Sequence, residues 1–402
     1  MPPLATSTLF FSTSLLLLSL AGYYTTWHLL LNNSTGDIMT HLRDHGPHVL
    51  PIPSHATITS GSNAKIEALN TTIPLRTQYT GVKRVDEQLT TLLVFFWEQV
   101  SGAREEYWPF NFHFAGGIAV GWALLTLEGL RKGGRGRVVG WTWAWGIGVQ
   151  TAAWAVVGPV WLAVHLLTAG SAGSEGELDV EVADVWSIPP ALVVGYVIPT
   201  LLMAKPAQAT EEWEKKQLWT VIWQAFPVWV SLSRLVFARS LKARLGGQEG
   251  RRAHGFNSLQ HRRSFYSVLL GVAVAIQVTA FWTATSKAAG ANLAGTEKFL
   301  YVFDLFKPCA ISPATKMGSI GEGAHLLLQW DELNLIQSLL LWSAALLHST
   351  VKSQGIRYRD HKAICLGSLG LSFVLPLGFA VSAVWLRDEL VFKKKDVEKK
   401  KR

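Results

Sequence analysis

Charged residues are scarce in this chain of 402 residues, because Asp, Glu, Lys and Arg together make up only 16% of it. Soluble domains carry about 25% charged residues. A chain that is 49% hydrophobic and this poor in charge is therefore not expected to be a soluble globular protein. Cysteine is almost absent, and the two that occur, Cys309 and Cys365, are too few for a disulfide scaffold. The same composition excludes a disordered chain and a collagen.

Several motifs of common enzyme classes are missing as well. The sequence has no Walker loop, no GxGxxG after a strand, no GxSxG elbow and no repeated Asp-rich magnesium box. No Cys/His spacing predicts a zinc site. We therefore expect a protein that needs no metal and no other cofactor. The net charge is +9, but such an excess in a membrane protein reports orientation, so we expect no nucleic-acid partner.

Long hydrophobic runs dominate what is present. A helix needs about 20 apolar residues to cross a bilayer, and backbone polar groups in lipid must be satisfied within the helix. The runs therefore predict an all-α, polytopic integral membrane helix bundle with seven to nine transmembrane helices. The run 89–101 is short for a crossing, and 138–168 is too long for one straight helix, so we expect it to kink at Gly158-Pro159. The runs lie at about 9–31, 89–101, 110–130, 138–168, 186–204, 217–238, 264–285, 325–349 and 363–386.

Four segments follow from these runs. Residues 1–31 are expected to form an N-terminal signal anchor, with a cleaved signal peptide as the alternative. Residues 32–88 are expected to be a lumenal loop, because they hold glycosylation sequons at Asn32, Asn33 and Asn70. Residues 89–386 form the transmembrane catalytic bundle. The basic tail 387–402 fits either a dilysine retrieval signal of the endoplasmic reticulum or contact with anionic lipid. We therefore expect a multi-pass protein of that membrane.

Lys and Arg gather in four places, at 131–137, 239–263, 352–362 and the C-terminal tail. Basic loops belong on the cytoplasmic side. Simple counting of the predicted spans cannot put all four on one side. At least two of the hydrophobic segments must therefore be re-entrant, split or misassigned.

Four carboxyl groups fall within or beside the hydrophobic runs, where burying a charge is costly and calls for a functional hypothesis. They are Glu98, Glu128, Asp331 and Glu332. Adjacent helical residues point about 100° apart, so Asp331 and Glu332 cannot share a face. The alternative is that these acids pair with buried donors and hold helices together.

The helix that carries Asp331 and Glu332 has two polar stripes, so it cannot face lipid on both sides. It belongs inside the bundle or against a polar cavity. One stripe contains Asp331, Asn334 and Ser338, and the other contains His325, Gln329 and Glu332.

Tryptophan is unusually common, with 18 residues. Indole faces attract cations, and a buried carboxyl tends to stay protonated and able to act as a general acid. An acid beside an aromatic-lined apolar cavity could therefore generate and guide carbocations, and polyprenyl substrates dissolve in the same bilayer. The alternative for any single Trp is interfacial anchoring or core packing.

Dispersed patterns over residues 75–350 resemble a known family. The matching stretches are Tyr79-Thr80-Gly81, Asp86, Leu92-Leu93-Val94-Phe95-Phe96, Trp108-Pro109, Glu128-Gly129-Leu130-Arg131, Gly158-Pro159, His165 and Leu328-Gln329-Trp330-Asp331. They resemble the membrane-bound terpene cyclases of fungal meroterpenoid clusters, of the ascofuranone and macrophorin type.

The resemblance implies cyclisation of a farnesyl chain on an aromatic or other polyketide head, started by protonating a terminal epoxide or alkene. It implies a membrane-embedded Asp or Glu as the acid, which in this chain is Asp331 or Glu98, the other accepting the final proton or stabilising charge. Asp86 matches too, but we expect it at the membrane edge.

We therefore predict a proton-initiated terpene cyclase with a prenylated small molecule as substrate and other enzymes of the same pathway as candidate partners. Glu332 and Glu128 are further candidate acids. The expected cavity residues are Trp97, Trp330, Phe95, Phe96 and Asn334. The alternatives are a transporter or exporter of a hydrophobic metabolite, another lipid-modifying enzyme, and a non-catalytic scaffold.

Overall fold

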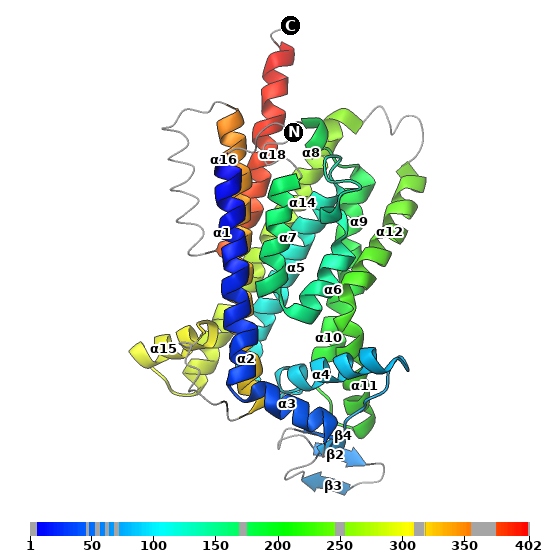
Figure 1. The fold of residues 1–402 in the computed structure, drawn as a ribbon, viewed down its shortest axis with the longest axis vertical. Helices are drawn as coiled ribbons and strands as arrows, with labels where there is room; N and C mark the ends of the chain where they lie inside the picture. The colour runs from blue at the N-terminus through cyan, green and yellow to red at the C-terminus, as the bar shows by residue number, and fades with distance from the viewer. Residues whose placement is uncertain are drawn as a thin grey trace.

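The computed structural model is an elongated bundle of helices (Figure 1). It describes residues 6–45, 48–52, 57–60, 64–67, 72–168, 175–245, 254–308, 317, 319–354 and 375–400. The helices along the long axis are α1 (Thr6–Tyr23), α5 (Trp108–Leu130), α6 (Thr142–Ala152), α7 (Trp154–Thr168), α9 (Val182–Leu192), α10 (Ile198–Ala204), α12 (Phe226–Leu245), α14 (His254–Gly290), α16 (Ile320–Ser353) and α18 (Pro376–Lys400).

The described residues contain four helices long and apolar enough to cross a membrane, namely Thr6–Asn32, Glu105–Leu130, Gly176–Ala204 and Leu259–Gly290. A fifth span is added if Thr210–Gln224 and Phe226–Arg244, which meet at an angle of 69°, count as one. The nearly all-α class is confirmed. Within the described residues the larger expected number of seven to nine spans is not confirmed, because the runs 89–101, 138–168 and 217–238 fold as short or bent helices and residues 363–374 of the last run lie outside the described residues.

The run 138–168 is a helical hairpin with a different break from the one expected. The chain turns at Ala153, which has a φ of +70°, and Pro159 lies inside α7 without ending it. Helices α6 and α7 then pack against each other. Trp145 stacks on Trp161 across this hairpin, with ring centroids 5.9 Å apart. The tip of the hairpin lies against the first helix, where the Trp27 indole donates to the Ala152 carbonyl at 3.0 Å.

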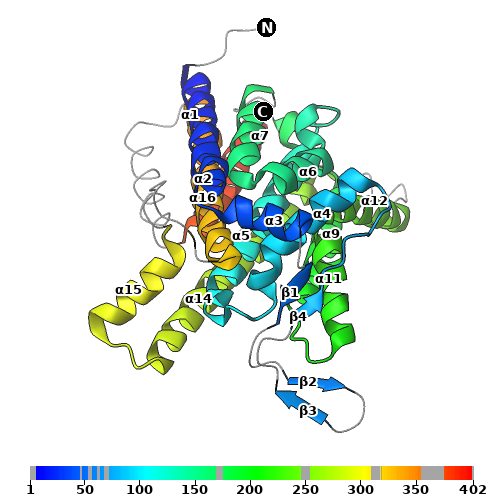
Figure 2. The same ribbon diagram turned by 60° about the horizontal axis from the view of Figure 1, so that its bottom comes forward.

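The described parts of the basic segments meet at one end of the bundle, which we call the basic end (Figure 1). Arg131 contacts Asp388 at 3.1 Å, and Arg263 contacts Glu389 at 2.5 Å. Both ends of the α6–α7 hairpin lie at this end. Helix α4 (Lys83–Val100) lies across the opposite end and does not cross (Figures 1 and 2).

The opposite end holds the 32–88 segment, which is not all helical. It contains α3 (Thr35–Asp44) and two antiparallel two-stranded sheets, one of β1 (Val49–Pro51) with β4 (Thr72–Pro74) and one of β2 (Thr57–Ser60) with β3 (Ala64–Glu67). Also described are α2 (Leu29–Asn32), α8 (Glu175–Leu178), α11 (Thr210–Gln224), α15 (Gly295–Phe306), 3-10 turns at Glu105–Tyr107 and Val138–Gly140, and π-helical segments at Tyr24–His28 and Val193–Val197.

The sequons differ in their surroundings. Asn32 is exposed, whereas Asn33 is only 5% exposed and its side-chain oxygen accepts a bond from the Thr35 backbone N–H at 3.1 Å. Asn70 lies outside the described residues. A buried Asn is a poor acceptor for a glycan, so the exposed Asn32 is the better candidate of the two.

Two glycines bring α5 and α16 close together. A Cβ at Gly117 would lie 3.2 Å from Leu335, and one at Gly121 would lie 3.1 Å from Leu339. The Gly-x-x-x-Gly spacing thus acts as a helix-packing motif. His113 precedes Gly117 by about one turn, so the same close approach carries its ring to α16.

Candidate functional site

A buried carboxyl and an imidazole meet where α5 packs on α16. The Glu332 carboxylate forms a short hydrogen bond with Nδ1 of His113, and both side chains are buried. Nε2 of His113 lies 2.9 Å from the side-chain oxygen of Gln277 in α14. Because an amide oxygen only accepts, Nε2 carries a proton and the proton between Nδ1 and Glu332 is the one that can move.

Three phenylalanines surround this pair, which we call the His113–Glu332 site. The ring of His113 meets Phe306 edge to face, with centroids 5.6 Å apart, and Phe281 at 6.4 Å. Phe281 and Phe306 stack at 4.7 Å, and Phe110 lies 6.2 Å from Phe306. Phe281 is 40% exposed, so the aromatic wall reaches the outer surface of the bundle between α14 and α15. This combination of movable proton and aromatic faces suits cation chemistry.

The two polar stripes of α16 are both buried, as expected of a helix inside the bundle. Asp331 and Glu332 point to different partners, as their spacing predicts. Oδ1 of Asp331 accepts the backbone N–H of Ala155 at 2.6 Å, near the start of α7. Ser338 on the same stripe accepts the indole N–H of Trp154 at 3.1 Å. Asp331 therefore caps α7 just after the break at Ala153.

Glu98 lies at the edge of the opposite end. Its carboxylate is 3.6 Å from Arg104 and 3.4 Å from the hydroxyl of Ser319, which caps α16. Asp331 is 12 residues further along α16, about 18 Å away at the rise of an α-helix. The structure does not bring together the two acids expected to cooperate.

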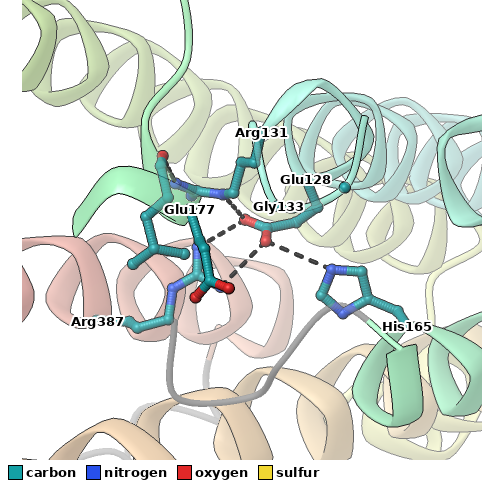
Figure 3. A pocket seen from close by; sticks show the side chains of 8 residues that line it. Glu128, Arg131, Gly133, His165, Glu177 and Arg387 are labelled. Carbon is teal, nitrogen blue, oxygen red and sulfur yellow. Dashed lines mark hydrogen bonds and ion pairs between the residues drawn. The ribbon is translucent and has the colours of Figure 1, made fainter. Parts of the chain in front are cut away.

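Glu128 belongs to an ion network at the basic end. Figure 3 shows its carboxylate between Arg131, Arg387 and His165. Arg131 and Arg387 each donate to Oε1 at 2.7 Å, Arg387 also donates to Oε2 at 3.0 Å, and His165 is 3.6 Å from Oε2. The small pocket beside it is also lined by Glu177 and has room for about one water-sized group.

The same network includes a second carboxylate that sequence reasoning missed. Asp388 contacts Arg131 and Arg387 at 3.1 Å and accepts from Tyr266 at 3.1 Å. Arg262 lies 3.7 Å from it. Arg387 and Asp388 were expected in the basic tail 387–402, but α18 continues the bundle and Phe392 is still buried. The Arg-Asp pair directly after an apolar run was the available signal.

Some of the residues expected to line a cavity pack against their neighbours, and others have polar atoms without a hydrogen-bond partner in the described part of the chain. Trp97 donates to the Pro51 carbonyl at 2.7 Å and packs on Trp213, which ties it to β1. Phe95 and Phe96 pack edge to face at 4.9 Å. The indole N–H of Trp330 and the side-chain oxygen of Asn334 have no hydrogen-bond partner within the described residues.

The buried tryptophans fit the packing alternative. Trp161 donates to the Val139 carbonyl at 3.0 Å, and Trp122 packs on Trp161 with centroids 5.6 Å apart. Trp122 also meets Phe226 edge to face at 5.0 Å. These rings hold α5, α7 and α12 together, so Trp122 and Trp161 serve the packing of the core.

Asp86 stabilises the turn before α4 through hydrogen bonds. Its carboxylate accepts the backbone N–H and the hydroxyl of Thr80, both at 2.8 Å, and the N–H of Gly81 at 3.0 Å. The Thr80 backbone bond is the main cause that holds the pKa of Asp86 below its usual value. Gly81 has a φ of +78°, which a side chain would strain. Asp86 is therefore a local structural residue.

The described residues hold no group of three or more His, Cys, Asp or Glu side chains placed to bind a metal ion. The candidate site is therefore a buried pair of an acid and an imidazole, surrounded by aromatic rings and enclosed by the helices of the bundle.

Known proteins place the chain in a family. The chain belongs to the CtvD domain family, which matches residues 11–392. It is 30% identical to terpene cyclase ascI of Acremonium egyptiacum, over 78% of this chain and 80% of that protein. It is 25% identical to terpene cyclase ctvD of Aspergillus terreus, over 78% and 85%, and 24% identical to terpene cyclase janA of Penicillium janthinellum, over 76% and 80%. No solved structure matches the chain.

Proposed function

We propose that this chain is an integral-membrane terpene cyclase that protonates the terminal epoxide or alkene of a farnesylated, meroterpenoid-type precursor and cyclises it through carbocations. The relatives named terpene cyclases support the class of enzyme. The observation that supports the chemistry is the His113–Glu332 site, in which a buried hydrogen bond between a carboxyl and an imidazole lies beside three phenylalanine rings.

The proton balance of such a reaction fits an acid–base pair. The pair gives its proton to the epoxide oxygen or to an alkene carbon, and cleavage of the C–O bond or addition to the alkene leaves a carbocation. An internal alkene attacks this cation and forms the ring bond. Loss of a proton from the carbon next to the last cation returns the proton to the pair. Substrate and product are therefore isomers, and the pair ends as it began.

The aromatic wall supports the same proposal. Phe281 and Phe306 present ring faces and edges within reach of His113, so cations formed there gain electrostatic stabilisation of about 0.5–2 kcal/mol for each close ring. Phe281 also lies at the outer surface, which gives a lipid-dissolved chain a short route to the site.

Cyclisation can be measured directly. Microsomes from a heterologous host that expresses the chain are given 2-farnesylphenol with and without its terminal epoxide. We expect a product of unchanged mass and new retention time, and the substrate that reacts identifies the protonated group. Return of the starting material alone, from folded protein and with several head groups, would favour transport or scaffolding instead.

We also propose the endoplasmic reticulum membrane, with the basic end in the cytosol and Asn32 in the lumen. Asn32 is the exposed last residue of α2, which lies at the opposite end of the bundle from α8 (Figure 1), and Arg131 donates to the Leu178 carbonyl of α8, which supports this orientation. Endoglycosidase treatment is expected to lower the mass of the wild-type chain by more than that of the Asn32→Gln variant. An unchanged wild-type mass would count against a glycan at this position.

A further inference from the structure

A second histidine lies near the His113–Glu332 site and takes no part in the proton transfer proposed there. His325 is on α16 and is 8% exposed. Its ring lies flat on Tyr107, with centroids 3.9 Å apart and an interplanar angle of 0°, and meets Phe110 edge to face at 4.7 Å. Two aromatic neighbours thus fix the plane of this imidazole.

The surroundings of His325 favour one tautomer. The backbone carbonyl of Leu305, which can only accept, acts on the ring, so a ring nitrogen directed at it carries the proton. Nδ1 has no partner within the described residues, so the donor is Nε2. No acidic side chain in the described ranges forms an ion pair with this ring, and a buried imidazole without such a partner is neutral. Nδ1 therefore presents a buried lone pair that accepts from nothing in the chain.

His325 lies on the same face of α16 as Glu332. The two are seven residues apart, which is close to two helical turns and about 10 Å. Gln329 lies between them and donates to the Asp304 and Leu305 carbonyls, both at 3.0 Å, so it is already occupied. This face of α16 therefore carries the unpartnered Nδ1 of His325 at one end and the His113–Glu332 pair at the other.

We propose that Nδ1 of His325 accepts a hydrogen bond from a hydroxyl on the polar head of the substrate. This rests on the proposed cyclase function, with the head at His325 and the prenyl chain extending along α16 toward Glu332. A buried acceptor without a partner is unfavourable in the free protein, and a phenolic hydroxyl would satisfy it. His325 is then a positioning and specificity residue, and it moves no proton.

Two substitutions separate this role from a structural one. In His325→Gln the side-chain amide reaches the Nε2 position and can still donate to Leu305, but the acceptor at the Nδ1 position is lost. In His325→Asn the amide oxygen occupies the Nδ1 position, while the donor to Leu305 is lost. Each variant is assayed in microsomes with two probes, 2-farnesylphenol and farnesylbenzene, both with the terminal epoxide.

The quantity compared is the ratio of kcat/KM for the two probes, which does not depend on how much of each variant folds. We expect the wild type to prefer the phenol by at least about tenfold, as one net hydrogen bond provides. We expect His325→Gln to lose this preference and His325→Asn to retain most of it.

Three results would overturn the proposal. A wild type that converts both probes equally well has no subsite for the hydroxyl. A preference retained in His325→Gln and lost in His325→Asn assigns the ring to the Leu305 bond. A wild type that converts neither probe removes the proposed function, and the assignment of His325 with it.

Discussion

Buried carboxylates at the two levels of this bundle have different partners. At the basic end, Glu128 and Asp388 face Arg131, Arg262 and Arg387. In the His113–Glu332 site the carboxylate faces an imidazole. A guanidinium does not give up its proton in the working pH range, so it keeps a carboxylate ionised, whereas an imidazole and a carboxyl can exchange one. Burial alone therefore does not make a carboxyl group suitable for proton transfer. The group that it is hydrogen-bonded to determines whether a proton can move.

The largest effect is expected from breaking the ion network. Glu128→Ala leaves Arg131 and Arg387 buried without one of their two carboxylates, so the free energy of unfolding should fall by about 3–5 kcal/mol. Unfolding by sodium dodecyl sulfate in mixed micelles measures it. Lys132→Ala removes an exposed pair with Asp179 and should cost less than about 1 kcal/mol. If the Glu128→Ala chain is as stable as the wild type but inactive, Glu128 has a catalytic role and not a structural one.

The next effect concerns activity. Glu332→Gln keeps a hydrogen bond to His113 but cannot hold the movable proton, so turnover should fall at least about 100-fold with little loss of stability. The isomerisation assay in microsomes measures it. Glu322→Gln, a matched change at a half-exposed carboxylate on the same helix, should stay within about threefold of the wild type. Equal activities of the two variants would remove the His113–Glu332 site from the reaction.

Much of this arrangement could be predicted from the sequence. Apolar runs predicted a helical bundle, and the polar residues on α16 predicted a buried helix whose two acids point apart. The Gly-x-x-x-Gly spacing of Gly117 and Gly121 is likewise a local pattern, and such spacings are common where two helices pack closely. These features are local, so a periodicity in one segment suffices to find them.

The partners of the acids could not be predicted, because they come from distant segments. His113 is 219 residues from Glu332, and Arg387 is 259 residues from Glu128. The break at Ala153 was also hidden, because Gly158-Pro159 is the stronger local signal while Asp331, 176 residues from Ala155, stabilises the start of α7. The position of that break therefore depends on a tertiary contact and not on the helix propensity of the local sequence.

Asp331 is a third kind of buried carboxylate, because its partner is a neutral backbone N–H and not a guanidinium or an imidazole. Asp331→Asn keeps an oxygen that can accept from Ala155, so we expect a loss of about 1 kcal/mol in stability and turnover within about threefold. Activity and unfolding in mixed micelles are measured on the same preparation. If turnover instead falls 100-fold in a stable chain, Asp331 is the acid, which is one of the two candidates that the family resemblance implied.

The smallest effect is expected at Asp86, which has neither a cation nor an imidazole. Bonds from Thr80 lower the pKa of this carboxyl, so its contribution to stability is fully present above the pKa of an unfolded Asp. That contribution is lost as the pH falls through the lower, folded value. Asp86→Asn should therefore be less stable than the wild type from about pH 5 upward, and the difference should shrink as the pH falls below about 4. Unfolding in mixed micelles from pH 3 to 7 measures this difference. A difference that grows toward low pH would show that the charge of Asp86 opposes folding and that its N–H donors do not compensate it.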